Sequence, residues 1–249
     1  MQTRIRIGVG GWTYEPWRDN FYPRGLPHAR ELEYASRQLT AIEVNGTYYS
    51  TMKPATFASW RDQTPEGFMF SLKASRFATN RKVLATAGES IGRFVASGIA
   101  ELGDKLGPLV WQFMPTKRFE PQDFGAFLKL LPREAARRPL RHVLDVRHES
   151  FACDEYLDLA RAHGCSTVHT DSDKFPNIAD GASELAYLRL MRCESGCPTG
   201  YPPALLDDWA QGCRAWVAQG SRREVFAFFI NGAKERAPAA AVELIRRIA

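Results

Sequence analysis

Short apolar segments alternate with amphipathic segments along the whole chain. The apolar segments are rich in branched and aromatic side chains, and they predict eight strands over residues 5–10, 41–45, 68–73, 109–112, 142–145, 166–170, 185–190 and 225–229. A period near 3.6 residues predicts helices over 29–39, 54–61, 90–106, 121–131, 154–162, 203–219 and 238–248. Only the sixth connection, near residues 173–182, lacks a helical pattern.

Strands that alternate with helices pair in parallel, because each helix carries the chain back to the same end of the sheet. Eight such units in 249 residues favour a closed barrel over an open sheet. The pattern therefore predicts an α/β protein with the architecture of a (β/α)8 TIM-type barrel. No repeat, low-complexity tract or Pro/Gly-rich linker divides the sequence, so we expect one domain over residues 1–249.

The composition is that of an ordinary soluble protein, with 45% hydrophobic and 24% charged residues. Residues 1–6 contain no apolar leader segment, and no apolar run approaches the roughly 18 residues that span a membrane. Five scattered cysteines, an odd number, do not suggest a disulfide framework. We therefore expect a cytoplasmic protein without a membrane partner. The net charge of +5 favours anionic partners without requiring nucleic acid.

The segment 41–45 gives the first indication of chemistry. Side chains alternate between the faces of a strand, so Ile42 and Val44 share one face while Glu43 and Asn45 share the other. We expect the polar face to point into the barrel. A carboxylate placed there costs several kcal/mol unless it is paired, hydrated or close to the mouth. Glu43 therefore predicts a polar site.

Other strands also end in polar side chains, and in TIM barrels the carboxyl ends of the strands carry the chemistry. Glu43 and Asp145 are candidates for acid and base catalysis, and Lys73 could hold an anionic oxygen or donate a proton. The loop 11–27 has a density of aromatic residues typical of a lid or pocket wall. The candidate ligand-binding residues are Trp12, Tyr14, Asn45, Tyr48, Gln112, Arg147, His148, Asp171, Arg189 and Asn231.

The same residues allow a reading without catalysis. Glu43 could pair with Lys73, and Asp145 with Arg147 or Arg189, in an internal lattice of ion pairs that only satisfies buried charge. The arginines between residues 133 and 141 precede the fifth strand, on the face associated with stability, and indicate a solvated basic edge.

The sequence also contains residues of the types that bind metals and phosphate. Glu43, Asp145, His169 and Asp171 are metal-ligating types but form no compact ligand motif, and the spacing Cys193-x3-Cys197 has no second matching pair. We assign no metal, and the cofactor is unknown. The loops 193–200 and 231–234 have the glycines of a barrel phosphate site, which ordinary turns explain equally well.

The chain resembles the DUF72 family, also called YecE-like, in motifs spread over nearly its whole length. These motifs are Gly10-Gly11-Trp12-x-Tyr14-x-x-Trp17, Phe21-Tyr22-Pro23, Glu43-Val44-Asn45-x-Thr47-Tyr48-Tyr49, Phe70-Ser71-Leu72-Lys73, the segment 106–115 and Asp145-Val146-Arg147-His148-Glu149-Ser150-Phe151. The resemblance implies a TIM-type barrel with a polar pocket at the strand ends. It implies no particular reaction, because the family has no established activity.

Three departures from the family pattern bear on the site. The family usually has Glu and Trp where this chain has Asp145 and Phe151, and a His-Gly pair where it has Met191-Arg192. A family-typical Asn-Asn pair is replaced by Ile230-Asn231. Loss of the imidazole implies either altered substrate choice or lost chemistry.

These observations lead to three hypotheses of different classes. The first is an enzyme that uses acid and base chemistry on a small anionic metabolite, phosphorylated or carboxylated, at the mouth of the barrel. The second is a nucleic-acid-binding protein or phosphodiesterase that uses a cationic mouth and an aromatic shelf. The third is a ligand sensor without turnover. The sequence leaves the substrate and the oligomeric state undetermined.

Overall fold

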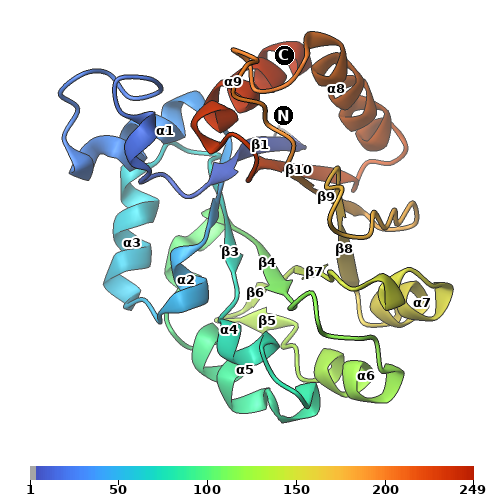
Figure 1. Ribbon diagram of the computed structural model, residues 1–249. Helices are drawn as coiled ribbons and strands as arrows, with labels where there is room; N and C mark the ends of the chain where they lie inside the picture. Colours follow the sequence, from blue (N-terminus) through green and yellow to red (C-terminus); the bar gives the residue numbers. More distant parts are fainter. Residues whose placement is uncertain (1–3) are drawn as a thin grey trace.

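The computed structural model describes residues 4–249, and its central element is a closed barrel of eight parallel strands (Figure 1). Around the barrel the strand order is β1-β10-β9-β8-β7-β4-β3-β2. The strands are β1 (Ile5–Gly10), β2 (Ala41–Val44), β3 (Met69–Lys73), β4 (Leu106–Gln112), β7 (His142–Asp145), β8 (Cys165–Thr170), β9 (Leu185–Leu190) and β10 (Glu224–Phe229). The α/β barrel fold and all eight predicted strands are confirmed, with differences of up to three residues at their ends.

Helices surround the barrel on its outer side (Figure 1). They are α1 (Glu31–Gln38), α2 (Gly46–Tyr49), α3 (Pro54–Gln63), α4 (Arg76–Thr79), α5 (Gly88–Val95), α6 (Pro121–Lys129), α7 (Asp154–Ala162), α8 (Pro203–Ala218) and α9 (Ala237–Ile248). Short 3-10 segments cover Glu15–Trp17, His28–Arg30, Leu84–Thr86, Ile99–Lys105, Glu149–Phe151 and Lys234–Arg236. The connection from β8 to β9 contains no helix, as predicted.

The prediction of one helix over 90–106 was wrong. The structure has α5, which ends at Val95, followed by a 3-10 segment that begins at Ile99. Gly98 separates the two with a φ of 106°, and a Cβ there would lie 2.7 Å from the backbone of Pro54. The chain must therefore turn against α3 at Gly98, and a continuous helix cannot form.

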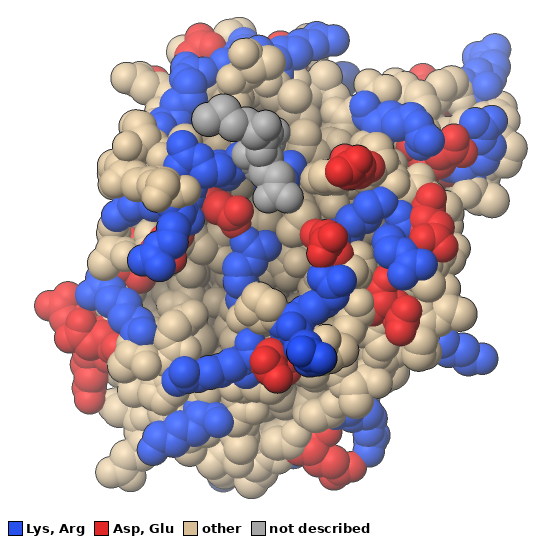
Figure 2. Space-filling model, turned by 180° about the vertical axis from the view of Figure 1, so that it is seen from behind, with Lys and Arg blue, Asp and Glu red and all other residues tan. Residues whose placement is uncertain are grey.

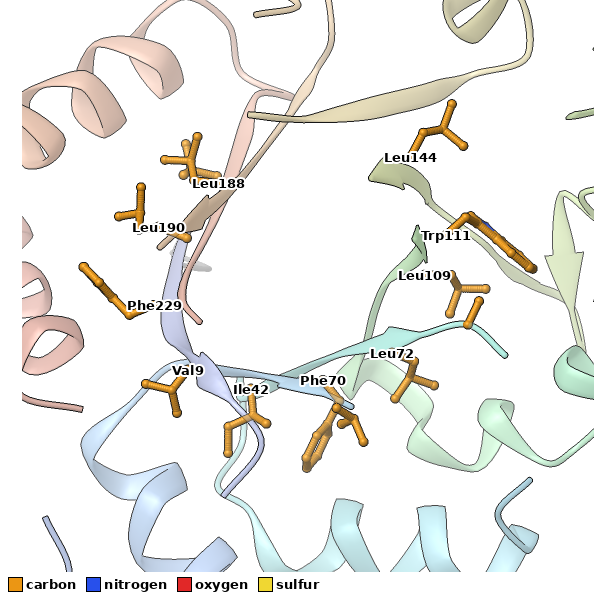
Figure 3. Packing of buried hydrophobic residues seen from close by; sticks show 14 of the residues in the cluster. Val9, Ile42, Phe70, Leu72, Leu109, Trp111, Leu144, Leu188, Leu190 and Phe229 are labelled. Atoms are coloured by element: carbon orange, nitrogen blue, oxygen red, sulfur yellow. The ribbon is translucent and has the colours of Figure 1, made fainter. Parts of the chain in front are cut away.

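The strands separate two hydrophobic layers, as the alternation of side chains requires. Ile42 and Val44 belong to the larger layer. Figure 3 shows Ile42 in this layer, between the sheet and the helices. A smaller cluster fills the barrel interior and contains Ala41, Val110, Val143, Val168, Leu185, Tyr187, Phe226, Phe228 and Ile230. Polar side chains at the carboxyl ends of the strands therefore pack against this apolar cluster.

Gly8 allows β1 and β2 to approach closely. Its partner in the register is Ala41, and a Cβ on Gly8 would lie 1.8 Å from the carbonyl oxygen of Ala41. No other residue type fits without separating the strands. This contact helps to fix the position of β2, which carries Glu43.

The arginines before the fifth barrel strand lie in and beside a small hairpin, β5 (Glu134–Ala135) and β6 (Arg138–Pro139), which the sequence did not predict. Arg138 pairs with Asp104 at 2.6 Å, and Arg141 pairs with Glu224. Acidic residues also lie among the lysines and arginines in the view of Figure 2. The partial exposure of Arg138 and Arg141 agrees with a solvated edge, and both arginines have an acidic partner. No helix within residues 4–249 has the length and apolarity to cross a lipid bilayer.

Candidate functional site

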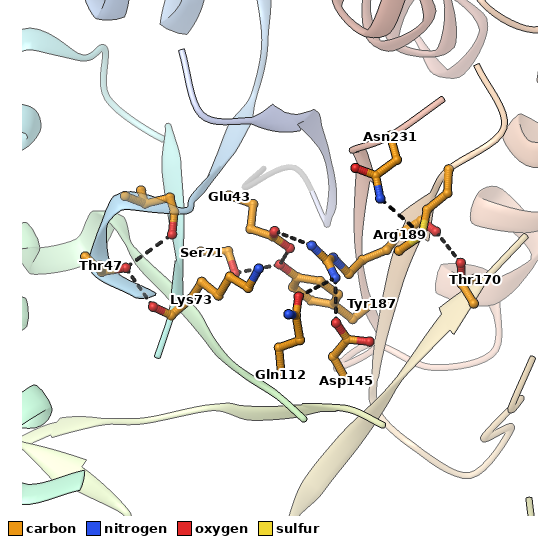
Figure 4. Close-up of polar contacts among 12 residues, drawn as sticks. Glu43, Thr47, Ser71, Lys73, Gln112, Asp145, Thr170, Tyr187, Arg189 and Asn231 are labelled. Carbon is orange, nitrogen blue, oxygen red and sulfur yellow. Dashed lines mark hydrogen bonds and ion pairs between the residues drawn. The ribbon is translucent and has the colours of Figure 1, made fainter. Parts of the chain in front are cut away.

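Charged and polar side chains from five strands meet inside the barrel at the carboxyl ends of the strands (Figure 4). We call this group the strand-end cluster. It consists of Glu43 on β2, Lys73 on β3, Gln112 on β4, Asp145 on β7, Arg147 just beyond β7, and Arg189 on β9. The register aligns Gln112 with Asp145 on neighbouring strands. The sequence named all six residues, and the barrel brings them together.

Arg189 is the centre of the cluster. Its Nη2 donates to Glu43 Oε1 at 2.9 Å, and its Nη1 donates to Asp145 Oδ2 at 2.5 Å. Both carboxylates are buried, and Arg189 is only 1% exposed. Burial opposes the charge of Arg189, but the two carboxylates outweigh it and raise the pKa of the guanidinium. Arg189 therefore remains a cation that joins two acids from β2 and β7, two strands that are not neighbours in the barrel.

Two neighbours of the cluster were missed by the sequence reasoning. Tyr187 donates its hydroxyl to Glu43 Oε2 at 2.8 Å, and the same hydroxyl lies 2.8 Å from Ser71 Oγ. Burial, followed by the charge of Glu43, raises the pKa of Tyr187 well above its usual value. Tyr187 and Ser71 each precede a cluster residue by two positions, so the strand period places them on the same inward face. That period was the signal that could have found them.

Arg147 connects the buried core of the cluster to its more open side. Its Nη2 donates to Asp145 Oδ2 at 2.9 Å and to Gln112 Oε1 at 2.8 Å. The guanidinium carbon also lies 4.5 Å from the centre of the Phe175 ring. The side chain of Arg147 is 13% exposed. A cation held in this way can still contact a ligand.

Lys73 differs from the two arginines because its amine lacks a carboxylate partner. Within residues 4–249, no acidic oxygen lies within 4.0 Å of Nζ, so the Glu43–Lys73 pair that the alternative without catalysis requires does not form. The amine lies over the Tyr48 ring, 4.5 Å from its centre. Burial, and next the charge of Arg189, lower the pKa of Lys73 to about 8. The amine can thus gain or lose a proton close to neutral pH.

The charges of the cluster do not cancel. Two carboxylates face three cationic groups, which leaves one positive charge in excess when Lys73 is protonated. An excess charge in a buried setting is costly unless an anion accompanies it. The arrangement is suited to a small anion near Lys73 and Arg147.

The predicted aromatic wall is partly engaged in packing. Trp12 packs edge-on against Trp60 of α3, with ring centres 5.1 Å apart. Lys234 Nζ lies over the Tyr14 ring, 4.2 Å from its centre. Tyr48 covers Lys73 and donates to Asn80 at 3.3 Å. Of these rings, Tyr48 is the one in contact with the strand-end cluster.

The remaining predicted residues occupy the ends of neighbouring strands. Asn45 lies against Gly10, since a Cβ on that glycine would be 3.0 Å from its amide nitrogen. His148 turns to Ser150, and its Nδ1 accepts from the Ser150 backbone N–H at 3.1 Å. Asp171 accepts from Tyr201 Oη at 2.5 Å and from the backbone N–H of Met191 at 2.6 Å. His148 and Asp171 therefore have local hydrogen-bond partners, while Asn45 packs beside the backbone of Gly10.

Met191 stands at the position where the family usually has an imidazole. It is buried, and its sulfur accepts a weak hydrogen bond from Asn231 Nδ2 at 3.7 Å. Arg192 is exposed and lies 3.5 Å from Asp173. A thioether cannot transfer protons, so this edge of the site lacks the acid–base group that the family pattern implies.

The two glycine-containing loops considered for phosphate bind each other. Ala233 N donates to Cys193 O across the two loops at 2.7 Å, and within the loop 193–200 Glu194 N donates to Gly200 O at 2.7 Å. Gly232 has a φ of 73°, and a Cβ there would lie 2.4 Å from Cys193 O. Close approach of the two loops therefore explains Gly232, and these backbone donors are used within the protein.

The four residues weighed as metal ligands do not converge. Glu43 and Asp145 are bound to Arg189 inside the barrel. His169 instead packs against Trp209 of α8, with ring centres 6.0 Å apart. Asp171 is hydrogen-bonded to Tyr201. This arrangement places Glu43 and Asp145 inside the barrel and the His169 ring against α8 on its outer side.

The fold and the site define the class of protein: it is a TIM-type barrel with a charged cluster at the carboxyl ends of its strands. Residues 6–249 match the family described as "Protein of unknown function DUF72", and the chain belongs to that family. The UPF0759 protein YecE of Escherichia coli K12 is 27% identical over 150 residues, which cover 59% of this chain and 50% of YecE. The match thus spans about half the length of that relative.

Solved structures show the same fold. A DUF72 family protein from Thermotoga maritima MSB8 has a TM-score of 0.73 at 20% identity, with 98% of each chain covered. A DUF72 family protein from Enterococcus faecalis V583 has a TM-score of 0.74 at 17% identity, covering 99% of this chain and 98% of that one. At these identities the likeness establishes the fold alone.

Proposed function

We propose that the protein binds a small anionic metabolite, phosphorylated or carboxylated, at the strand-end cluster and acts on it by proton transfer. The observation that supports this most is the amine of Lys73, which is 7% exposed and has no carboxylate within 4.0 Å among residues 4–249. A bound anion would supply the missing negative charge. The charge of Arg147 also acts on Lys73, and its partly exposed guanidinium can hold a second anionic oxygen.

Lys73 is the best candidate to carry the proton. General acid–base catalysis is most efficient when the pKa of the group lies near the working pH, and the pKa of Lys73 is about 8. Glu43 and Asp145, which the sequence offered for this role, have oxygens already bound by Arg189 and, for Glu43, by Tyr187. We assign these acids to holding Arg189 and to setting the charge around Lys73.

A binding screen with a matched variant tests the proposal. Thermal shifts for phosphorylated, carboxylated and neutral metabolites are measured on wild type, Lys73→Met and Lys129→Met, the last being an exposed lysine on α6. We expect anions alone to stabilise the wild type and Lys129→Met, with at least about tenfold weaker binding to Lys73→Met. Equal, negligible shifts for all compounds, or equal binding to both variants, would refute an anion site at Lys73.

The pH dependence of binding has a defined direction. Lys73 carries its charge below about pH 8 and loses it above, so anion affinity should fall between pH 7 and pH 9. A ligand that binds tightly with no turnover would favour the sensor hypothesis over the enzyme. Turnover that survives in Lys73→Met would exclude Lys73 as the proton carrier.

A second candidate function, nucleic-acid binding, is supported by an exposed group beyond β2 and β3. Tyr49 and Phe77 are both 60% exposed, and the guanidinium of Arg76 lies 5.7 Å and 5.4 Å from their ring centres. Exposed rings beside a cation can stack on bases. A steep loss of affinity for single strands with added salt, about 0.7 per phosphate contact in logarithmic slope, would support this candidate. Weak binding that salt does not change would oppose it.

A further inference from the structure

A second group of charged side chains lies at the amino-terminal ends of the barrel strands, opposite to the strand-end cluster. Ile5 and Ile7 of β1 belong to the layer between the sheet and the helices, so Arg6 between them points into the barrel. Arg6 is aligned with Phe226 of β10, which belongs to the interior cluster. Glu224 precedes Phe226 by two positions and shares its face of β10. The apolar interior of the barrel therefore separates this group from the strand-end cluster.

A cavity of about 720 Å³ lies at this end of the barrel. Its lining includes the apolar side chains of Met69, Leu106 and Phe226. The cations of the lining are Arg6, Arg61, Lys105, Arg138 and Arg141. The acids are Glu66, Asp104 and Glu224, which leaves two positive charges in excess. Small-molecule sites have volumes of about 300–1,000 Å³ and combine apolar walls with a few polar groups, so this cavity has the size and composition of such a site.

Four of the five cations already have partners within the protein. Arg138 and Arg141 each bind an acid of the cavity. Arg61 binds the neighbouring Asp62 at 2.8 Å. Lys105 Nζ donates to the backbone carbonyl of Arg61 at 2.5 Å. These four side chains therefore form the wall of the cavity and are held in place by it.

Arg6 differs from the other four cations. Within residues 4–249, no carboxylate oxygen lies within 4.0 Å of its guanidinium, and its N–H groups donate no hydrogen bond to the protein. Residues 1–3 are Met, Gln and Thr, so they add no acidic side chain. Burial lowers the pKa of Arg6; the charge of Glu224 opposes this effect and that of Arg141 adds to it. The partly exposed guanidinium of Arg6 is therefore available to an anionic ligand.

We propose that this cavity binds a small phosphate monoester with an apolar ester group, for which phenyl phosphate is the simplest probe. A phosphate monoester carries about two negative charges at neutral pH, which matches the excess charge of the lining. The planar guanidinium of Arg6 can bind two phosphate oxygens at once. Met69, Leu106 and Phe226 can then cover the ester group. The site shares no residue with the strand-end cluster, so it does not depend on the proposed function.

Matched ligands test the chemistry of the site on the full chain. Phenyl phosphate, phenyl sulfate and inorganic phosphate are titrated at pH 7.5 while NMR follows the methyl group of Met69, assigned with Met69→Leu. Phenyl sulfate has nearly the shape of phenyl phosphate but a single charge, and inorganic phosphate lacks the ring. We expect phenyl phosphate to bind about tenfold tighter than either of the other two. Equal binding of all three, or no change at Met69 with any of them, would overturn the proposal.

Variants on both sides of the charge balance show where the phosphate binds. Arg6→Gln should weaken the binding of phenyl phosphate at least about tenfold, whereas Arg118→Gln, at an exposed arginine outside the cavity, should not change it. Glu66→Gln removes a negative charge from the exposed rim and should strengthen binding about threefold.

Two comparisons decide the result. Lys73→Met alters the strand-end cluster alone, so the response of Met69 to phenyl phosphate should persist in it even if no anion binds at Lys73. Wild-type affinity in Arg6→Gln, or a loss in Lys73→Met as large as that in Arg6→Gln, would overturn the proposal. If Arg6→Gln does not fold, Glu66→Gln decides, and unchanged or weaker binding to that variant would overturn the proposal.

Discussion

Replacement of Arg189 by methionine tests the charge network at its centre. In wild type, Arg189 binds Glu43 at 2.9 Å and Asp145 at 2.5 Å. In Arg189→Met, Asp145 retains Arg147 at 2.9 Å, whereas Glu43 retains only the hydroxyl of Tyr187. One buried carboxylate is therefore left without a cation, which costs about 3–5 kcal/mol.

Two matched variants separate this effect from lost packing. Arg147→Met removes a partly exposed partner from Asp145, which keeps Arg189, so we expect a loss of about 1 kcal/mol. Glu43→Leu combined with Arg189→Met removes the orphan charge and should recover about 2 kcal/mol or more of the single-variant loss. The free energies of unfolding follow from urea titration monitored by circular dichroism.

Acidification independently tests whether the uncompensated carboxylate causes the loss of stability in Arg189→Met. Between pH 7 and pH 5 an uncompensated buried carboxylate takes up a proton more readily than one in the unfolded chain, so the deficit of Arg189→Met should shrink. If Arg189→Met loses less than about 1 kcal/mol of unfolding free energy at pH 7, or if its loss stays constant on acidification, Arg189 does not compensate buried charge.

Three further predictions concern neighbouring residues. Tyr187→Phe should cost about 1–3 kcal/mol in urea unfolding because Glu43 and Ser71 both lose a partner, and a change below 0.5 kcal/mol would show that the hydroxyl is dispensable. Wild type should gain stability as pH rises from about 8 to about 10.5, because the folded state releases the Lys73 proton at a lower pH than the unfolded chain does. Lys73→Met should lack that rise in unfolding titrations. Equal pH dependence of the two proteins would contradict the lowered pKa of Lys73. Gly8→Ala should lower the free energy of unfolding by about 3 kcal/mol or prevent folding. Gly196→Ala, whose added Cβ meets no neighbour, should change thermal stability little. Wild-type stability in Gly8→Ala would contradict the close approach of β1 and β2.

Strand periodicity predicted the features that depend on local sequence. Alternation placed Ile42 and Val44 toward the helices and Glu43 inside, and the parallel arrangement then brought Glu43 and Asp145 to the same end of the barrel. Pairs of side chains across the barrel were harder to predict from the sequence, because they depend on strand order and on side-chain length. Glu43 therefore pairs with Arg189, a residue 146 positions away, and not with Lys73 on the adjacent strand.

Loops were the least predictable part. Gly98 breaks the expected helix because of a contact with Pro54, and no local pattern announces that contact. The turn of His148 toward Ser150 likewise depends on the geometry beyond β7. The absent helix after β8 was predicted from the sequence, but the cavity between strands β8 to β10 and helix α8 depends on how α8 packs.

The titration of Lys73 tests the central claim most directly. NMR of 13C-labelled lysine side chains, assigned with Lys73→Met, reports the midpoint for each amine. We predict a midpoint of about 8 for Lys73, which rises when an anion from the binding screen is added, because the anion stabilises the charged amine. A midpoint near 10.5 that no anion changes would contradict a buried cation poised for anionic ligands at the strand ends.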